Sequence, residues 1–127
     1  MPGAMRITQD FTFDAAHKLG GERPDGSGDA RYARLHGHSF HVRVAIAGDP
    51  DPEAGWVADF GAVRKALDAL RAELDHAYLN EIEGLETPTL ERIAVWIAEK
   101  LAPTFPGLAN VTVARPSIGE SCSYELA

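Results

Sequence analysis

The chain has 127 residues, of which 45% are hydrophobic, enough for one domain with an apolar core. Its 12 Lys and Arg against 19 Asp and Glu give a net charge of -7, which argues against nucleic acids or anionic membranes as partners. No apolar run approaches membrane-spanning length, the N-terminus lacks an apolar signal segment, and the single cysteine excludes an internal disulfide. We therefore expect one domain, residues 1–127, located in the cytoplasm.

The first half of the chain predicts two strands joined by a long connection. Residues 5–17 end in an alternating pattern whose apolar face is formed by Phe11, Phe13, Ala15 and His17. Residues 38–47 alternate more regularly, with one face formed by His38, Phe40, Val42, Val44 and Ile46. The connection, KLGGERPDGSGDARYAR, is too long for a tight hairpin turn. Its composition fits a mobile flap beside the histidines or, equally, a tolerated surface insertion.

The second half predicts two helices followed by two strands. Asp59 is expected to cap a helix that runs to Leu74 and buries Phe60, Val63, Leu67, Leu70 and Leu74. Thr87-Pro88 is expected to open a second helix, with Pro at its first position and a buried stripe of Leu90, Ile93, Ala94, Ile97 and Leu101. Strands are predicted over 109–115 and 120–126. The order ββααββ indicates an α+β fold, with an antiparallel four-stranded sheet and both helices on one face.

Three histidines are predicted to share the buried face of the first two strands. In LHGHSFHV, His36 and His38 are two residues apart and therefore lie on the same face of a strand. Antiparallel pairing of the two strands brings His17 close to both. A His-x-His pair alone is often ordinary packing, but a third histidine on the same face favours a metal site, because burying three unpaired imidazoles is costly. Three neutral imidazoles with one open position are typical of catalytic zinc, whereas His41 lies on the opposite face.

A second candidate site is the pair Asp75-His76 in LDHAYLN. Adjacent residues on a regular element point apart, so the two side chains need an irregular backbone to meet, and the end of a helix provides one. An ordinary loop between helices is the alternative interpretation. A cupin-like small β-barrel also uses His-x-His on a strand, but here no Glu follows at the expected spacing and two amphipathic helices intervene.

Several of these segments together resemble the 6-pyruvoyltetrahydropterin synthase family, and most closely its bacterial 6-carboxytetrahydropterin synthase branch of the queuosine pathway. They are FDAAH, RLHGHSFHV, GWVADFGAVRKAL, LDHAYLN and GLETPTLERIAVWI, in order along almost the whole chain. The resemblance implies a tunnelling fold whose subunits join edge to edge into barrels, as a homohexamer of two trimers with active sites between subunits. The implied reaction converts 7,8-dihydroneopterin triphosphate to 6-carboxy-5,6,7,8-tetrahydropterin, with loss of triphosphate and acetaldehyde.

By motif match, the resemblance implies roles for five residues. His17, His36 and His38 match the zinc ligands, and Asp75 and His76 match the proton-relay pair. The zinc would hold the hydroxyls of the substrate side chain and acidify its carbon-bound protons. Edge-to-edge barrels would also place His41, and Arg43 beside it, on the barrel lining.

The chain departs from the family at two positions. Tyr32 stands where the family usually carries a cysteine base, and Arg115-Pro116 stands where it carries the Glu-Thr that anchors the pterin. Glu120 is either a displaced carboxylate that anchors the pterin's amino and N–H groups or a plain strand residue. The one cysteine, Cys122, is expected to be a small core residue.

Two functional hypotheses follow from these departures. One is a zinc-dependent lyase acting on a pterin triphosphate. The other is a divergent paralogue without the loop cysteine, which binds zinc and a pterin with altered or lost lyase activity.

Overall fold

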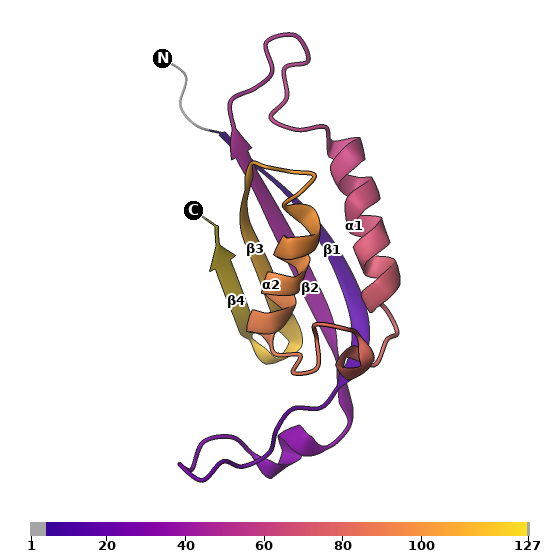
Figure 1. The fold of residues 1–127 in the computed structure, drawn as a ribbon, viewed down its shortest axis with the longest axis vertical. Coiled ribbons are helices and arrows are strands. Elements are labelled where there is room, and N and C mark those ends of the chain that lie inside the picture. The colour runs from indigo at the N-terminus through magenta and orange to yellow at the C-terminus, as the bar shows by residue number, and fades with distance from the viewer. Residues whose placement is uncertain (1–4, 127) are drawn as a thin grey trace.

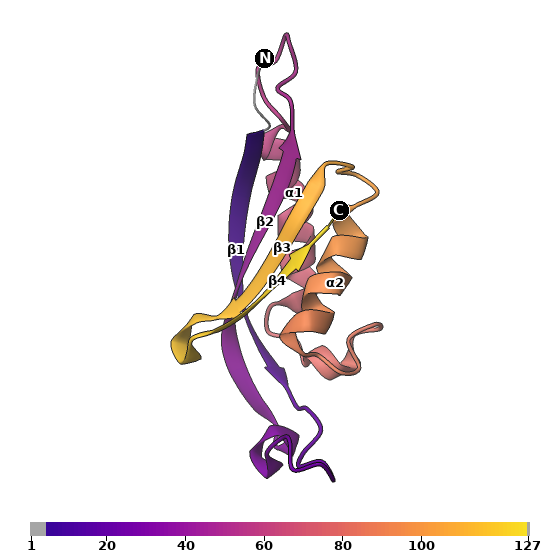
Figure 2. The same cartoon turned by 90° about the vertical axis from the view of Figure 1, so that its left-hand side faces the viewer.

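The computed structural model describes residues 5–126 and contains one antiparallel sheet covered on one face by two helices (Figure 1). The strands lie side by side in chain order: β1 (Met5–His17), β2 (His36–Gly48), β3 (Leu108–Arg115) and β4 (Glu120–Glu125). Helix α1 (Phe60–Leu74) packs on β1, and helix α2 (Leu90–Leu101) packs on β3 and β4. Figure 2 shows both helices on the same side of the twisted sheet. The predicted ββααββ order is confirmed, and a cupin-like barrel is excluded.

The core lies between the sheet and the helices, where the alternating apolar residues point. Phe13 and Phe40 are paired across β1 and β2, and their stacked rings have centroids 4.8 Å apart. The predicted helix stripes are buried, with one exception: Phe60 keeps 52% of its surface exposed. Phe60 is the first residue of α1, and the buried stripe begins one turn later, at Val63.

The two helices begin with side-chain caps. Asp59 caps α1 as predicted, because its carboxylate accepts a hydrogen bond from the Gly61 N–H at 2.9 Å. The predicted start of the second helix at Thr87-Pro88 is wrong. Thr89 is the cap of α2 and accepts a hydrogen bond from the Arg92 N–H at 3.2 Å, so Pro88 precedes the helix. The Pro88 carbonyl is therefore outside the helical hydrogen-bond ladder and free to bind another group.

The connection between β1 and β2 extends from one end of the sheet (Figure 1). It contains a short 3-10 helix, Ala30–Ala33, and the Leu19 N–H donates a 2.7 Å hydrogen bond to the Tyr32 carbonyl across it. The segment is thus folded back on itself beside the ends of the two strands. No helix among residues 5–126 is long and apolar enough to cross a membrane.

Candidate metal centre and active site

The three predicted histidines converge at one end of the sheet. In the β1–β2 register His17 is paired with His36 and Ala15 with His38. All three imidazoles therefore project from the helix-covered face of the sheet. One ring nitrogen from each lies within 4.8 Å of the others. The Nε2 atoms of His17 and His36 are 3.0 Å apart. This is close to the ~3.3 Å that separates two nitrogen ligands on tetrahedral zinc with bonds of about 2.0–2.1 Å.

Backbone carbonyls fix the tautomers of two of these rings. The buried His17 donates from Nδ1 to the Pro88 carbonyl at 3.1 Å, and His36 donates from Nδ1 to the Arg34 carbonyl at 2.7 Å. A carbonyl can only accept, so in the neutral rings both Nε2 atoms carry a lone pair. Two facing lone pairs at 3.0 Å repel each other unless a cation or proton lies between them. This arrangement fits a metal ion, because metal-binding histidines commonly donate their other ring nitrogen to a carbonyl.

The surroundings of these histidines favour the neutral form that binds metals. Burial lowers the pKa of His17 from 6.5 to about 4, and the neighbouring His36 and His38 act in the same direction. Burial also lowers the pKa of His38, followed by the positive charge of Arg115 and by His36. A metal ion would therefore not compete with a proton on either ring at neutral pH.

Asn80 connects the two chain segments that hold His17 in place. Its Oδ1 accepts from the Lys18 N–H at 2.9 Å, and its Nδ2 donates to the carbonyls of Lys18 at 2.8 Å and Glu86 at 3.3 Å. The first segment follows His17 directly, and the second leads to Pro88. Sequence reasoning missed both Asn80 and Pro88. The available signal was an amide at the end of LDHAYLN, which can both donate and accept.

Asp75 and His76 form the predicted pair just after α1. Asp75 Oδ2 accepts from His76 Nδ1 at 2.8 Å, and Asp75 Oδ1 accepts from the Asp14 N–H at 2.9 Å. The bond from Asp14 and then the bond from His76 lower the pKa of the Asp75 carboxyl. The irregular backbone that the pair requires is present, since His76 has a φ of 60°. The His76 side chain is exposed, with Nδ1 held and Nε2 left available.

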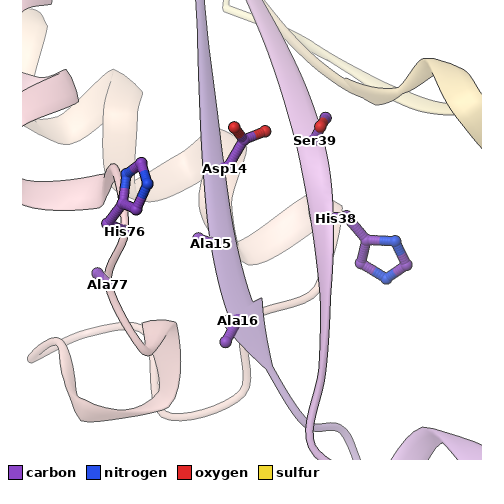
Figure 3. Close-up of a pocket in the computed structure, with 7 residues that line it drawn as sticks. All are labelled: Asp14, Ala15, Ala16, His38, Ser39, His76 and Ala77. Atoms are coloured by element: carbon purple, nitrogen blue, oxygen red, sulfur yellow. The ribbon is translucent and has the colours of Figure 1, made fainter.

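The relay pair and the three histidines do not meet within one chain. His76 and His38 line opposite parts of an open cavity of about 350 Å³ around Asp14, Ala16 and Ser39. Figure 3 shows His76 on the far side of β1 and the His38 ring pointing away from it, beyond β2. The structure therefore forms both predicted groups but keeps them on different sides of the β1–β2 hairpin.

A second cavity, which we call the histidine cavity, has a volume of about 220 Å³. Its lining includes Tyr32, His36, His38, Arg115 and Glu120. Tyr32, at the position of the missing cysteine, thus faces the same space as two of the histidines. Glu120 lies opposite Arg115 in the β3–β4 register, and its Oε1 is 3.0 Å from Arg115 Nη2.

Cys122 is placed as a packing residue. It lies on β4 opposite Val113, is partly buried and packs against the hydrophobic core, as expected. Burial raises the pKa of its thiol, and the negative charge of Glu91 adds to this effect. Cys122 does not line the histidine cavity, so the structure supplies no thiolate at this site in place of Tyr32.

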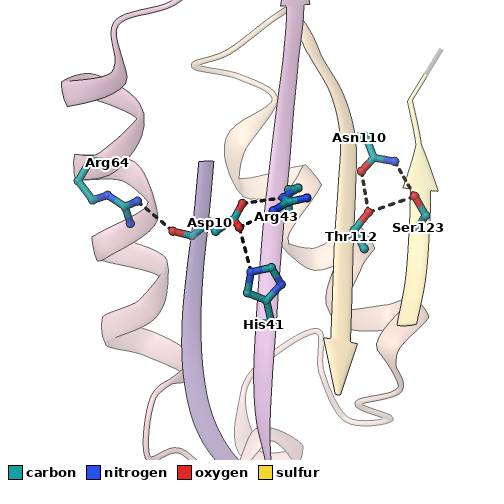
Figure 4. Close-up of polar contacts among 7 residues, drawn as sticks. All are labelled: Asp10, His41, Arg43, Arg64, Asn110, Thr112 and Ser123. Atoms are coloured by element: carbon teal, nitrogen blue, oxygen red, sulfur yellow. Dashed lines mark hydrogen bonds and ion pairs between the residues drawn. The ribbon is translucent and has the colours of Figure 1, made fainter. Parts of the chain in front are cut away.

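His41 lies on the opposite face of the sheet from the three histidines, as predicted. Its Nε2 is 3.0 Å from Asp10 Oδ2, and Arg43 makes two 2.9 Å hydrogen bonds to the same carboxylate (Figure 4). These three side chains form a polar network on the outer face of the sheet. The guanidinium of Arg43 lowers the pKa of Asp10, with a smaller contribution from His41.

The fold and the three-histidine cluster define a small α+β protein with a candidate metal centre at the rim of its sheet. The sequence matches the model of the family described as 6-pyruvoyl tetrahydropterin synthase over residues 6–127, and the chain belongs to this family of lyase-type pterin synthases.

Two relatives illustrate the range of activities in the family. The chain is 46% identical to 6-carboxy-5,6,7,8-tetrahydropterin synthase of Synechocystis sp., over 84% of this chain and 83% of that protein. It is 36% identical to dihydroneopterin monophosphate aldolase of Pyrococcus furiosus, over 94% of this chain and 92% of that protein.

Solved structures confirm the tunnelling fold. The structure of Caenorhabditis elegans 6-pyruvoyl tetrahydropterin synthase matches with a TM-score of 0.83 at 25% identity, covering 98% of this chain and 97% of that one. The Plasmodium vivax 6-pyruvoyl tetrahydropterin synthase matches with a TM-score of 0.73 at 16% identity, over 98% of this chain and 99% of that one, which shows a shared fold.

Proposed function

We propose that the chain is a zinc-dependent lyase that converts 7,8-dihydroneopterin triphosphate to 6-carboxy-5,6,7,8-tetrahydropterin, a step of queuosine biosynthesis. The reaction releases triphosphate and acetaldehyde from the side chain of the pterin. The observation that carries this proposal is the convergence of three imidazoles beside a cavity in a member of a pterin synthase family. The 46% identity to the Synechocystis synthase favours the carboxy product.

His17, His36 and His38 would hold the zinc through their facing nitrogens. Bound zinc would polarise the side-chain hydroxyls of the substrate and acidify its carbon-bound protons. The carbonyls of Pro88 and Arg34 orient two of the rings for this purpose. Positioning the ligands in this way avoids an entropic cost at the moment of metal binding.

Asp75 and His76 would transfer protons to and from the substrate. The Asp75 carboxylate accepts the Nδ1 proton of His76, so Nε2 carries the lone pair that can take a proton from the substrate. Because this pair and the histidine cavity lie on different sides of the β1–β2 hairpin, we propose that an active site combines the cavity of one chain with the relay pair of another. A homohexamer of two trimers, with sheets joined edge to edge, would provide such sites.

A second candidate is an aldolase that cleaves the C1′–C2′ bond of a dihydroneopterin phosphate. The absence of a cysteine from the histidine cavity favours it, as does the 36% identity to the Pyrococcus aldolase. A retro-aldol cleavage begins by removing a proton from the C2′ hydroxyl. The C1′–C2′ bond then breaks, C2′ and C3′ leave as phosphorylated glycolaldehyde, and the electrons of the broken bond move into the ring. Protonation at C1′ then completes a hydroxymethyl group. No carbon-bound proton has to be abstracted, so a strong thiolate base is not needed.

Both candidates are tested by incubating zinc-loaded protein with the triphosphate and, separately, the monophosphate of 7,8-dihydroneopterin and identifying products by mass spectrometry. A 6-carboxytetrahydropterin together with acetaldehyde supports the synthase. A 6-hydroxymethyl-7,8-dihydropterin supports the aldolase. Unchanged substrate in both reactions, with zinc bound and the protein folded, refutes both and leaves the binding-only paralogue.

A further inference from the structure

We propose that Arg115 is a specificity-determining residue that donates hydrogen bonds to the carbonyl of the substrate's ring, beside Glu120, which accepts from the ring N–H and amino groups. The two side chains would then recognise one edge of a 2-amino-4-oxo heterocycle through hydrogen bonds. This inference rests on the proposed function, because a pterin is the ring in question. Arg115 is a cationic donor, whereas the family resemblance implies a carboxylate acceptor at this position.

Register and burial place these two side chains together at the histidine cavity. Arg115 ends β3, Glu120 begins β4, and the two face each other directly across the strand pair. The short 3-10 helix Pro116–Ile118 and Gly119 close the turn between them. Both line the cavity beside His36 and His38. A ring bound against this pair would therefore lie next to the candidate metal centre.

The guanidinium of Arg115 is largely buried, with only 14% of the side chain exposed, whereas 52% of the Glu120 side chain is exposed. Its ion pair with Glu120 uses Nη2, while Nε is buried and has no hydrogen-bond acceptor among residues 5–126. Buried donors are normally paired, and one left unpaired is costly. The Arg115 guanidinium at the cavity therefore has a hydrogen-bond donor without an acceptor. Such an unpaired donor is expected in a group that binds a ligand.

The charge balance of the pair favours a ring edge over a phosphate. Arg115 and Glu120 together carry no net charge, so they give little attraction to a phosphate, and the Glu120 carboxylate would repel it at close range. The Arg115 guanidinium donates and the adjacent Glu120 carboxylate accepts. Together they complement a ring edge on which a carbonyl acceptor lies beside an N–H donor. The carbonyl, ring N–H and amino group of a pterin form such an edge.

The test is a comparison of two unphosphorylated ligands by fluorescence titration of the zinc-loaded protein. Neopterin has the 2-amino-4-oxo edge. Its 2,4-diamino analogue, with the same side chain, replaces the carbonyl with a second amino donor that faces the Arg115 donors and replaces the ring N–H with an acceptor that faces Glu120. The wild type should prefer neopterin by roughly 10- to 100-fold, the range for a hydrogen bond to a charged group. Arg115→Gln should reduce this preference at least about threefold, because an amide can present either its oxygen or its nitrogen to position 4 of the ring.

Two further variants keep the test decisive. Arg92→Gln removes a positive charge from an exposed position on α2 and should leave the wild-type preference unchanged. Glu120→Gln changes an exposed side chain, and it should weaken neopterin binding by about tenfold or more if the carboxylate accepts from the ring. This variant tests the recognition pair independently if Arg115→Gln does not fold, as judged by circular dichroism.

The outcomes separate this inference from the proposed function. Neopterin binding with the full preference retained in Arg115→Gln overturns the role of Arg115 and leaves the proposed function intact. In a parallel titration with neopterin triphosphate, an affinity loss confined to this ligand, with neopterin binding unaffected, also overturns the inference, because Arg115 would then contact the phosphates. Failure of the wild type to bind any pteridine overturns the inference and the proposed function together.

Discussion

Acidifying the metal-free protein from about pH 7.5 to about pH 4.5 is expected to reduce its free energy of unfolding by about 2–3 kcal/mol through His17 alone. His17 is fully buried, and this burial lowers its pKa from 6.5 to about 4. The unfolded chain takes up a proton near pH 6.5, whereas the folded chain does so only near pH 4. The stability that the neutral ring contributes is therefore present above pH 6.5 and is lost as the pH falls through this window.

The magnitude follows from the size of the shift. A pKa lowered from 6.5 to about 4 differs by about 2.5 units between the two states, and each unit corresponds to about 1.4 kcal/mol, so the full effect is about 3 kcal/mol. His38, whose pKa is also lowered by burial, adds to the loss in the same direction. Carboxylates with lowered pKa values, such as Asp10 and Asp75, lose their contribution only as the pH falls below 3.8, the ordinary pKa of an aspartate. The window between pH 6.5 and pH 4 therefore reports on the histidines.

The assay is urea unfolding followed by tryptophan fluorescence, with a chelator present and the protein concentration held constant. His17→Gln removes the titrating group while keeping a polar side chain of similar length. It should lose most of the pH dependence between pH 7.5 and 4.5, although its stability at pH 7.5 is lower. Equal stability of the wild type at both pH values, or an unchanged slope in His17→Gln, would refute the reasoning.

Three other predictions concern the metal centre and the relay pair. His36→Ala should retain the wild-type circular dichroism spectrum but bind no stoichiometric zinc by atomic absorption; full metal content would contradict the ligand assignment. Asn80→Ala loses three hydrogen bonds to the segments around His17, so it should be about 1–3 kcal/mol less stable and bind zinc at least about tenfold more weakly. Unchanged zinc affinity in a competition titration would limit Asn80 to a structural role. His76→Gln should keep its zinc while kcat falls by about 100-fold or more, and an unaffected kcat would exclude His76 as the proton-transfer residue.

Local patterns in the sequence were sufficient to predict the three-histidine cluster. Alternation in residues 5–17 and 38–47 assigns His17 and His38 to the buried face, and antiparallel pairing of neighbouring strands then brings them together. The Asp59 cap follows from equally local information. The start of α2 was harder, because Thr87 and Thr89 both flank Pro88 and either hydroxyl could cap a helix.

Contacts between distant segments explain what the sequence did not reveal. Asn80 binds Lys18, which is 62 residues earlier, and Pro88 accepts from His17, which is 71 residues earlier. Neither contact has a periodic pattern, because both depend on how the loop before α2 lies against the end of β1. The same holds for the separation of His76 from the histidine cavity, which depends on the side of the hairpin that each group occupies.

The left-handed backbone conformation of His76 sets thermal stability against retention of the imidazole at this position. A residue with a side chain at a φ of 60° is strained by roughly 1 kcal/mol relative to glycine, so His76→Gly should raise the melting temperature by a few degrees. A selection for thermal stability would therefore favour loss of this imidazole. Libraries of variants selected for a higher melting temperature should therefore keep histidine at position 76. A melting temperature of His76→Gly at or below the wild-type value would make this precaution unnecessary.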